Sequence, residues 1–397
     1  MGKLRVDEAE VQGKTVLVRV DFNVPLDGGQ VSDDTRIAAA LPTIRYLTGQ
    51  GARVVLASHL GRPKGKRDPA LSLAPVAMRL EQLLGSPVAF CESVVGPAAA
   101  GAVAELEPGG VLLLENLRFH AGEERNDPDF SRSLAELAHA YVSDAFGTVH
   151  RAHASIAGVA SHFSQVACGF LIAKELEFLG RVLNQPLSPY VAILGGAKVG
   201  DKIQLVRSLL QRADTLLIGG AMAYTFLKAL GHQVGASLLD EPHLELASQL
   251  LQEAADQGKA VLLPSDHLVA SQATPEADVE TCGVDIPEGR IGLDIGPESV
   301  ARYQAALTQA RMIVWNGPMG MFELPQFREG TFAIARAAAD SAAMSVVGGG
   351  DLVAAVNQAG VAGRISHIST GGGASLEFLE CKSLPGIEVL TEAGSPA

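Results

Sequence analysis

The stretch VAILGGAKVGDKI, residues 191–203, decides how the rest of the chain is interpreted. Its apolar run Val191–Leu194 is short, branched and uncharged, which predicts a buried strand. The two glycines that follow permit a sharp turn and the close approach of a ligand to the backbone. If a helix begins there, Lys198 and Lys202 lie on one face of it, beside free backbone N–H groups. The pattern is typical of a phosphate-binding turn, and a plain strand-to-helix turn with surface lysines explains it equally well.

Short apolar runs of the same kind recur along the whole chain. They lie at residues 16–20, 54–57, 111–114, 142–146, 191–194, 215–218, 260–263, 312–315 and 345–347. The runs lack in/out alternation, which indicates strands buried on both faces of parallel sheets. Ala- and Leu-rich stretches with helical character separate them. We therefore predict an α/β fold of two doubly wound, Rossmann-like parallel-sheet lobes, each with three α/β/α layers, joined by a hinge.

Chain length and a break in the pattern predict where the chain divides. With 397 residues, the chain is longer than one hydrophobic core usually serves. The helical periodicity of Leu171–Leu179 ends, and Asn184–Pro189 then contains two prolines before a new strand begins. We expect the domain boundary near Gly180–Pro189.

Composition and charge exclude several classes of protein. Hydrophobic residues make up 47% of the chain and charged residues 19%, which is typical of a globular protein. No stretch is apolar enough to span a bilayer, and the first residues do not resemble a secretory signal. The four cysteines are widely separated, which favours a reducing, cytoplasmic location. A net charge of −13 argues against nucleic acid or an anionic membrane as partner.

Cationic and hydrogen-bonding side chains follow the strands predicted in the first half. They are Asp21 and Asn23, Arg36 at a predicted helix start, His59 and Arg62, Arg118, and then His150, Arg151 and His153. Parallel strands end at a common edge, where ligands of open α/β sheets bind. Because the arginine fork binds phosphate and carboxylate in bidentate fashion, the group predicts a pocket for a small polyanion. Asp21 and Asn23 could orient a substrate hydroxyl, although Asp21 could equally fix an arginine. Each arginine alone is as well explained by a solvated surface residue or a carboxylate partner. The histidines fit no zinc pattern, which favours helix packing or anion contact for them.

Glycines follow the strands predicted in the second half. The clusters are Gly195-Gly196, Gly219-Gly220, Gly317 with Gly320, Gly348–Gly350 and Gly371–Gly373. Backbone N–H groups at such turns bind phosphate, and a glycine surface admits a flat base. Asp351 stands where an oxygen ligand for Mg²⁺ is useful, and Glu323 is suited to ribose hydroxyls. The alternative for each cluster is a tight turn or close packing, but five clusters at one edge favour a nucleotide site.

Familiar nucleotide and hydrolase signatures are absent. The chain has no G-x-G-x-x-G, no complete P-loop and no G-x-S-x-G elbow. Without a nucleophile triad or a metal cluster, the chemistry points to positioning and charge neutralisation.

Taken together, the motifs resemble the phosphoglycerate kinase family over essentially the full chain. They are Arg19–Pro25, Ser58–Pro63, Glu115–Phe119, His150–Ser155, Gly195–Val199, Trp315–Pro318 with Glu323, Gly348–Asp351 and Ser369–Ser375. The resemblance implies reversible phosphoryl transfer between 1,3-bisphosphoglycerate with MgADP and 3-phosphoglycerate with MgATP, in glycolysis, by a cytoplasmic, hinge-bending monomer. It also implies an N-terminal phosphoglycerate lobe of residues 1–180 with the C-terminal segment 381–397, and a nucleotide lobe of residues 181–380.

The resemblance also assigns residues to ligands. The phosphoglycerate ligands implied are Asp21, Asn23, Arg36, His59, Arg62, Arg118 and Arg151. The nucleotide ligands implied are Lys198, Lys202, Gly219, Gly220, Gly292, Asn316, Glu323, Gly349, Gly350, Asp351 and Leu352, with Asp351 on Mg²⁺. Leu352 departs from the family pattern, in which Thr or Ser usually follows Gly-Gly-Asp.

The implied chemistry agrees with what the residues suggest. A carboxylate acceptor needs no general base. The loose phosphoryl transition state needs charge stabilisation, for which we expect Arg36 and Lys198, assisted by Gly372 and Gly373. Closure at a hinge near Leu179–Pro189 would bring the two half-sites together and remove water.

Two other readings of the sequence remain open at this stage. One is a nicotinamide dehydrogenase, which the missing glycine fingerprint disfavours. The other is a two-lobed anion-binding protein without catalysis, which predicts an export signal and no second ligand.

Overall fold

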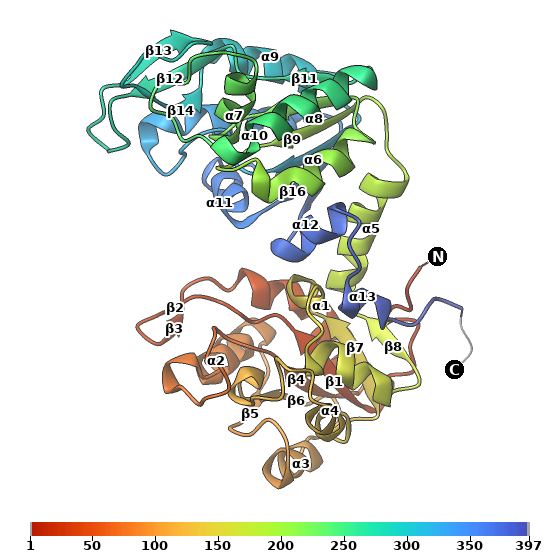
Figure 1. The fold of residues 1–397 in the computed structure, drawn as a ribbon. Coiled ribbons are helices and arrows are strands. Elements are labelled where there is room, and N and C mark those ends of the chain that lie inside the picture. Colours follow the sequence, from red (N-terminus) through yellow and green to blue (C-terminus); the bar gives the residue numbers. More distant parts are fainter. Residues whose placement is uncertain (1, 395–397) are drawn as a thin grey trace. The chain divides into compact units, whose positions relative to one another are not determined.

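The computed structural model of the protein describes residues 2–394 and divides the chain into two compact units (Figure 1). The first unit runs to Glu177 and takes in the residues from Ser383 onward, and the second unit is Phe178–Lys382. The division falls inside one helix, α5 (Phe170–Asn184).

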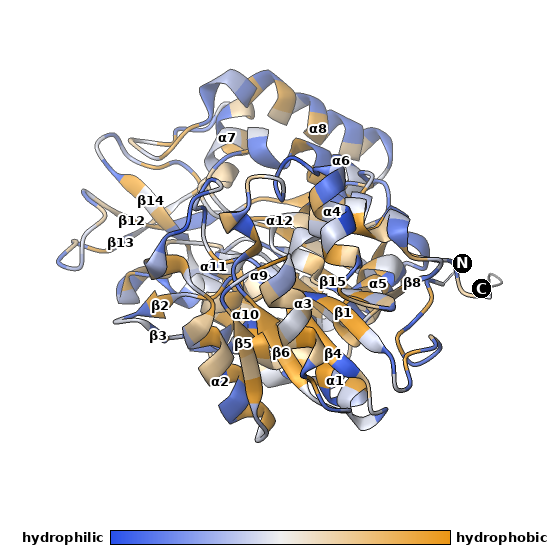
Figure 2. Cartoon of the chain, turned by 90° about the horizontal axis from the view of Figure 1, so that it is seen from below, coloured by the Kyte–Doolittle hydropathy of each residue, from blue (hydrophilic) through white to orange (hydrophobic). Residues whose placement is uncertain are grey.

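The first unit is built on a six-stranded, fully parallel sheet of strand order β5-β6-β4-β1-β7-β8. Its strands are β1 (Thr15–Val20), β4 (Arg53–Ala57), β5 (Val88–Cys91), β6 (Val111–Leu114), β7 (Ala140–Asp144) and β8 (Val166–Cys168). Every residue of β1 is buried, so both faces of the sheet are covered there, as the apolar sequence of the strand requires. Figure 2 shows β4 and β6 in the colours of hydrophobic residues.

Helices and a short hairpin complete the first unit. They are α1 (Thr35–Gly49), α2 (Ala74–Leu84), α3 (Pro97–Ala104), α4 (Pro128–Ala135), α13 (Pro385–Glu388) and the hairpin β2 (Leu26–Asp27) with β3 (Gln30–Val31). The start of α4 shows why helices begin where they do. Pro128 occupies the first turn, and the Asp127 carboxylate accepts hydrogen bonds from the N–H groups of Asp129 and Phe130.

Gly386 and Thr391 join the C-terminal segment to the rest of the first unit. Thr391 N donates to Val166 O at 3.0 Å, and Leu4 N donates to Thr391 O at 2.8 Å. Gly386 N donates to Val149 O at 2.8 Å. These bonds join the two ends of the chain within one unit.

The second unit has its own six-stranded parallel sheet, of strand order β11-β10-β9-β15-β16-β17. Its strands are β9 (Tyr190–Leu194), β10 (Thr215–Ile218), β11 (Ala260–Leu262), β15 (Met312–Asn316), β16 (Met344–Gly348) and β17 (His367–Ile368). The central strands β9 and β15 are buried throughout, and the Trp315 side chain lies fully in the core.

Its helices are α6 (Ile203–Leu210), α7 (Met222–Ala229), α8 (Leu244–Asp256), α9 (Pro297–Thr308), α10 (Glu329–Asp340), α11 (Gly350–Gln358) and α12 (Gly373–Leu379). None of the helices formed by residues 2–394 is long and apolar enough to cross a membrane.

A three-stranded sheet of order β13-β12-β14 adds to the second unit (Figure 1). Its strands are β12 (Asp266–Ala270), β13 (Glu280–Gly283) and β14 (Ile291–Ile295), all antiparallel. The sequence analysis did not predict this sheet, because its strands are interrupted by charged residues. The edge strands β5, β8 and β17 were also missed, since each has only two to four residues.

The α/β prediction is confirmed, and each of the nine predicted runs contains a strand. The run predicted to reach Phe146 ends as a strand at Asp144, because Phe146 already belongs to a 3₁₀ turn. Lys198 and Lys202 would share a helix face only if a helix began at the glycine turn, and none begins there. Helix α6 begins only at Ile203, after a 3₁₀ turn over Gly200–Lys202, so Lys198 lies outside any helix.

Candidate functional site

The carboxyl edge of the first sheet carries the predicted anion-binding residues. Asp21 and Asn23 directly follow β1, His59 and Arg62 follow β4, and Arg118 and Arg151 follow β6 and β7. Arg36 lies in the first turn of α1. The strand order places β1 between β4 and β7, so the loops from these three strands leave the sheet side by side.

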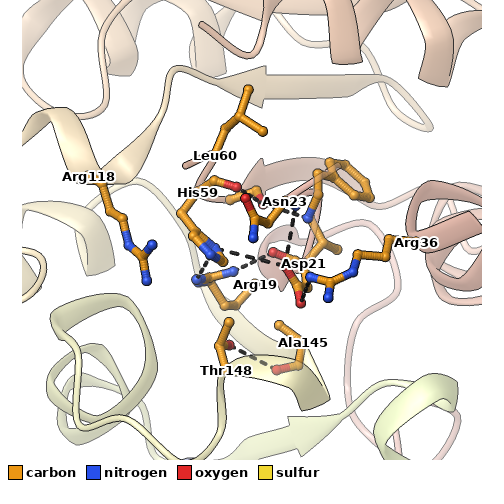
Figure 3. Close-up of polar contacts among 12 residues, drawn as sticks. Arg19, Asp21, Asn23, Arg36, His59, Leu60, Arg118, Ala145 and Thr148 are labelled. Carbon is orange, nitrogen blue, oxygen red and sulfur yellow. Dashed lines mark hydrogen bonds and ion pairs between the residues drawn. The ribbon is translucent and has the colours of Figure 1, made fainter. Parts of the chain in front are cut away.

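A pair between Arg36 and Asp21 organises this edge. Arg36 Nη1 donates to Asp21 Oδ2 at 2.7 Å, and the other oxygen, Asp21 Oδ1, accepts from Asn23 N at 3.3 Å. Asn23 Oδ1 in turn accepts from Gly61 N at 2.9 Å (Figure 3 shows Arg36, Asp21 and Asn23). The Asp21 side chain is 10% exposed and that of Arg36 is 37% exposed, so the guanidinium keeps donors open to a ligand.

The surroundings of His59 show that the arginines converge. Burial lowers the pKa of His59 well below its ordinary value, and four positive charges lower it further, from Arg19, Arg118, Arg151 and Arg36 in that order. His59 is therefore neutral at pH 7, so its 3.9 Å approach to Asp21 is not an ion pair. A neutral imidazole surrounded by arginines indicates a local positive region in an acidic protein.

The Arg118 side chain is held by Gly61, and not all of its N–H groups are used in hydrogen bonds. Its Nη1 donates to Gly61 O at 2.7 Å, and its Nε lies 3.3 Å from Glu124 Oε1. That contact does not have hydrogen-bond geometry, and the buried Nε has no hydrogen-bond partner among residues 2–394. Burial is also the largest cause that lowers the pKa of Arg118. A buried guanidinium with an unused donor fits an anion that arrives with the ligand.

Arg151 and Arg62 differ in how firmly they are held. Arg151 Nε contacts His150 Nε2 at 3.1 Å. Arg62 is exposed and makes no hydrogen bond or ion pair within the described part of the chain. It follows Gly61, whose N–H and C=O bind Asn23 and Arg118, so its backbone is fixed although its side chain is not.

The structure adds Arg19 to the group, to which the sequence analysis assigned no role. Arg19 lies inside β1, is only 1% exposed, and reaches His59 Nδ1 with its Nη2 at 3.3 Å. Its signal in the sequence is a charged residue inside a strand whose other members are mostly apolar.

The glycines at the carboxyl edge of the second sheet fall into two classes, the first of which serves backbone packing. A Cβ atom on Gly195 would lie 2.0 Å from Pro318 O, one on Gly220 2.5 Å from Gly196 N, and one on Gly317 2.4 Å from Gly195 O. A Cβ atom on Gly219 would likewise lie 2.5 Å from the Met319 Sδ atom. These glycines bring three strand-end turns into contact, so the packing alternative holds for them.

The second class of glycines faces open space. A Cβ atom on Gly350, Gly372 or Gly373 would meet nothing within 4 Å among the described residues. Gly349 and Gly372 have φ values of +103° and +52°, which other residues adopt rarely. Gly350 begins α11, whose first N–H groups have no carbonyl partner within a helix. These positions leave backbone donors accessible to a ligand.

Lys202 is partly buried, and the charge of Asp351 acts on it. Its Nζ donates to Gly195 O and lies 3.5 Å from Asn316 O. Burial lowers the pKa of Lys202 to about 8, while the charges of Asp351 and Asp201 act in the opposite direction. Lys198 is exposed, and the turn after it is held by a 2.9 Å bond from Gly200 N to Asp240 Oδ2.

The remaining predicted nucleotide residues occupy different environments. Asn316 is buried and its Nδ2 donates to Gly348 O at 2.8 Å, whereas Glu323 is exposed. Leu352 is fully buried in the core of the second unit, so its side chain packs and only its backbone can meet a ligand. Gly292 lies in β14, where a Cβ atom would clash with the Tyr224 hydroxyl at 2.3 Å.

The donors present fit a magnesium ion that arrives with a nucleotide. No group of three or more His, Cys, Asp or Glu side chains that could hold a metal occurs among residues 2–394. Asp351 is an exposed carboxylate in the first turn of α11, beside the accessible N–H groups. Mg²⁺ with a nucleotide commonly uses one protein carboxylate, since phosphate oxygens and water supply the other ligands.

Known proteins of one family match the chain from end to end. The model of the family described as phosphoglycerate kinase matches residues 6–382. Phosphoglycerate kinase from Moorella thermoacetica is 57% identical, with 99% of this chain and 100% of the relative covered. That from Synechococcus elongatus is 54% identical, with 97% of each covered.

Solved structures agree with the sequence relatives. The structure of phosphoglycerate kinase from Coxiella burnetii superposes with a TM-score of 0.89 at 41% identity, over 98% of both chains. The crystal structure of phosphoglycerate kinase from Pyrococcus horikoshii OT3 gives a TM-score of 0.85 at 35% identity, again over 98% of both chains. The carboxyl edge of one sheet carries arginines, and that of the other carries accessible glycines. Together with these matches, this shows that the chain belongs to the phosphoglycerate kinase family.

Proposed function

We propose that the chain catalyses reversible phosphoryl transfer between 1,3-bisphosphoglycerate with MgADP and 3-phosphoglycerate with MgATP, and that each unit holds one ligand. One observation supports the assignment of one ligand to each unit, namely that the carboxyl edges of the two sheets present different groups. One gathers four arginines around a neutral histidine, and the other offers glycine N–H groups beside a partly buried lysine, Lys202.

The first unit is the proposed phosphoglycerate site. Its arginines Arg36, Arg118 and Arg151 supply the charge that neutralises phosphate and carboxylate, with Arg62 contributing from an exposed position. Asp21 and Asn23 orient the ligand hydroxyl and hold Arg36 and Gly61 in place. The four arginine charges that surround the buried His59 are the most direct support for an anion here.

The second unit is the proposed nucleotide site. Lys202 and the N–H groups of Gly350, Asp351 and Leu352 bind the phosphates, and Glu323 accepts from the ribose. Asp351 would hold Mg²⁺, which supplies charge neutralisation between the phosphate groups when bound. Gly219, Gly220 and Gly292 contribute by shaping the backbone that borders the adenosine.

The reaction needs positioning more than proton transfer. The carboxylate of 3-phosphoglycerate is ionised at neutral pH, so it attacks without a general base. The transferred group requires cations at its equatorial oxygens and an in-line approach. Arg36 and Lys198 fill that role, with the N–H groups of Gly372 and Gly373. We further propose that the Leu179–Pro189 segment bends during turnover, and that the chain acts as a cytoplasmic monomer.

The test is a steady-state assay of ADP formation from MgATP and 3-phosphoglycerate, with hydroxylamine added to trap the acyl phosphate. We expect ADP formation that depends on both substrates and stops when EDTA removes Mg²⁺. A protein that binds 3-phosphoglycerate but forms no ADP would support the anion-binding alternative and overturn the proposal.

A further inference from the structure

Two buried charges lie beneath the phosphoglycerate pocket without a direct ion pair. Arg19 is 1% exposed and Glu123 is fully buried. No carboxylate among residues 2–394 lies within ion-pair distance of Arg19. The Glu123 carboxylate has one basic side chain within ion-pair distance among residues 2–394, that of His153, whose Nδ1 lies 3.8 Å from Glu123 Oε1. Burial and the neighbouring arginines lower the pKa of His153 to about 4, so it carries no charge at pH 7.

The hydroxyl of Ser155 connects these two charges. Ser155 Oγ accepts a hydrogen bond from Arg19 Nε at 2.8 Å and donates one to Glu123 Oε1 at 2.6 Å. A guanidinium only donates and a carboxylate only accepts, so the direction of the hydroxyl proton is determined. The short bond to Glu123 is typical of a hydroxyl that donates to a charged oxygen.

Backbone bonds hold this bridge in position. Ser155 N donates to Glu123 Oε2 at 3.0 Å, and Ala154 N donates to Glu123 O at 2.9 Å. The Tyr141 hydroxyl, which belongs to β7, donates to Ser155 O at 2.8 Å. The bridge is therefore pre-organised by the sheet and does not depend on a ligand.

The Arg19 guanidinium, which Ser155 holds through Nε, contacts the His59 ring through Nη2. Arg19 Nη2 lies 3.3 Å from His59 Nδ1, and Nη1 donates to Val20 O (Figure 3). Because the guanidinium can only donate, Nδ1 must accept, and the proton of the neutral ring then resides on Nε2. Asp21 Oδ1 is 3.9 Å from Nδ1, which is too far for the hydrogen bond that would favour the other tautomer.

We infer that Glu123, Ser155 and Arg19 are positioning residues, which hold His59 as a neutral ring that presents its Nε2–H to the bound phosphoglycerate. His59 Nε2 makes no hydrogen bond with the described part of the chain, so this donor is unused in the free protein. The neutral ring adds a directed hydrogen bond without adding charge to four neighbouring arginines. The role toward phosphoglycerate rests on the proposed function, whereas the tautomer does not.

The first test measures the tautomer itself. In protein with ¹⁵N-labelled histidine, a long-range ¹H–¹⁵N spectrum at pH 7 should show His59 neutral and protonated on Nε2. Because this is read in the wild-type protein without substrate, it does not depend on catalysis or on a variant that folds. A ring protonated on Nδ1, or on both nitrogens, would overturn the inference.

The second test breaks and restores the bridge. Ser155→Ala removes the hydroxyl and should change the His59 ¹⁵N pattern toward a mixture of tautomers. It should also raise KM for 3-phosphoglycerate about tenfold, the equivalent of losing one hydrogen bond, with KM for MgATP unchanged. Ser155→Thr keeps a hydroxyl and should restore both readouts.

The matched control is Ser131→Ala. Ser131 is a buried serine of the same unit whose hydroxyl donates to Asp127 O at 2.8 Å, outside the bridge. It should alter neither the His59 spectrum nor KM. An unchanged His59 spectrum in a folded Ser155→Ala protein would contradict the inference. A wild-type protein with the expected tautomer but no turnover would contradict the proposed function alone.

Discussion

The two sheet edges differ in the groups that they offer to an anion. The first uses charge: its arginines are tied to carboxylates and carbonyls, such as Arg36 to Asp21 and Arg118 to Gly61. The second uses backbone: its accessible donors are N–H groups next to glycines, with Lys202 largely withdrawn from solvent. The proposed function accounts for this difference. A phosphoglycerate brings its negative charge unshielded, whereas a nucleotide that brings Mg²⁺ with it would need fewer cations from the protein.

The comparison also separates rigid from adaptable parts. In the first unit, the buried network under the pocket fixes side-chain direction before a ligand binds. In the second unit, close glycine contacts fix the backbone, and the charged side chains of Lys198, Glu323 and Asp351 are exposed. The largest effects on turnover are therefore expected from the arginines, and the largest effects on folding from the packed glycines.

The largest expected effect is that of Arg36→Ala. Removing a cation that stabilises the transition state should lower kcat by about 10²–10³-fold, with MgATP binding unchanged. Steady-state kinetics and a MgATP titration measure both. Arg45→Ala is the matched control, because Arg45 lies in the same helix but donates to Leu83 O. Equal activity of the Arg36 and Arg45 variants would contradict the role of Arg36.

The next effect concerns pH and Lys202. Burial lowers its pKa to about 8, so the ammonium is charged at pH 7 and is lost as the pH rises through 8. A bound phosphate favours the charged form, so affinity for MgATP should fall by up to about tenfold per pH unit above 8. Calorimetry between pH 7 and 9 measures this. In Lys202→Arg the side chain stays charged, so the affinity for MgATP should no longer depend on pH in this range. If the wild-type affinity did not depend on pH, the placement of Lys202 at the phosphates would be refuted.

The two glycine classes should respond differently to alanine. Gly220→Ala should lower the free energy of unfolding by about 1–3 kcal/mol or more, because φ is +63° and the new Cβ atom meets Gly196 N. In Gly373→Ala the new Cβ atom meets nothing within 4 Å among residues 2–394, so stability should be unchanged. The Cβ atom would occupy space that the proposed ligand needs, so kcat should fall. Thermal unfolding and kinetics on the same samples distinguish them. Equal stability losses would show that the division into packed and open glycines is wrong.

The smallest effect on ligand binding is expected from Leu352→Thr, which introduces the residue that family members usually have. The Leu352 side chain is buried in the core, so the change should cost about 1–3 kcal/mol of stability through lost apolar burial. The affinity for MgATP should stay the same, because the backbone N–H remains. A clear gain in affinity would indicate that the hydroxyl contacts the nucleotide.

Sequence alone predicted the parallel sheets well and the details around them less well. Runs such as Val191–Leu194 are recognisable because a strand buried on both faces is mostly apolar. The antiparallel strands β12 to β14 alternate with charged residues such as Asp266 and Glu280, so periodicity does not reveal them.

The candidate site shows the same limit. Asp21, His59 and Arg118 were found because they follow apolar runs, a local signal. The bridge from Glu123 through Ser155 to Arg19 joins residues up to 136 positions apart, so only the fold brings them together. The glycines looked alike in sequence, and only the space around each one distinguishes packing from access.

The central claim is that each unit holds one ligand, and paired calorimetric titrations test it most directly. Arg118→Ala should weaken 3-phosphoglycerate binding about 10–100-fold, the loss expected for hydrogen bonds to a charged ligand, and leave MgATP binding intact. Lys202→Ala should do the reverse by a similar factor. If either variant weakened both ligands equally, the division of the two substrates between the two sheet edges would be contradicted.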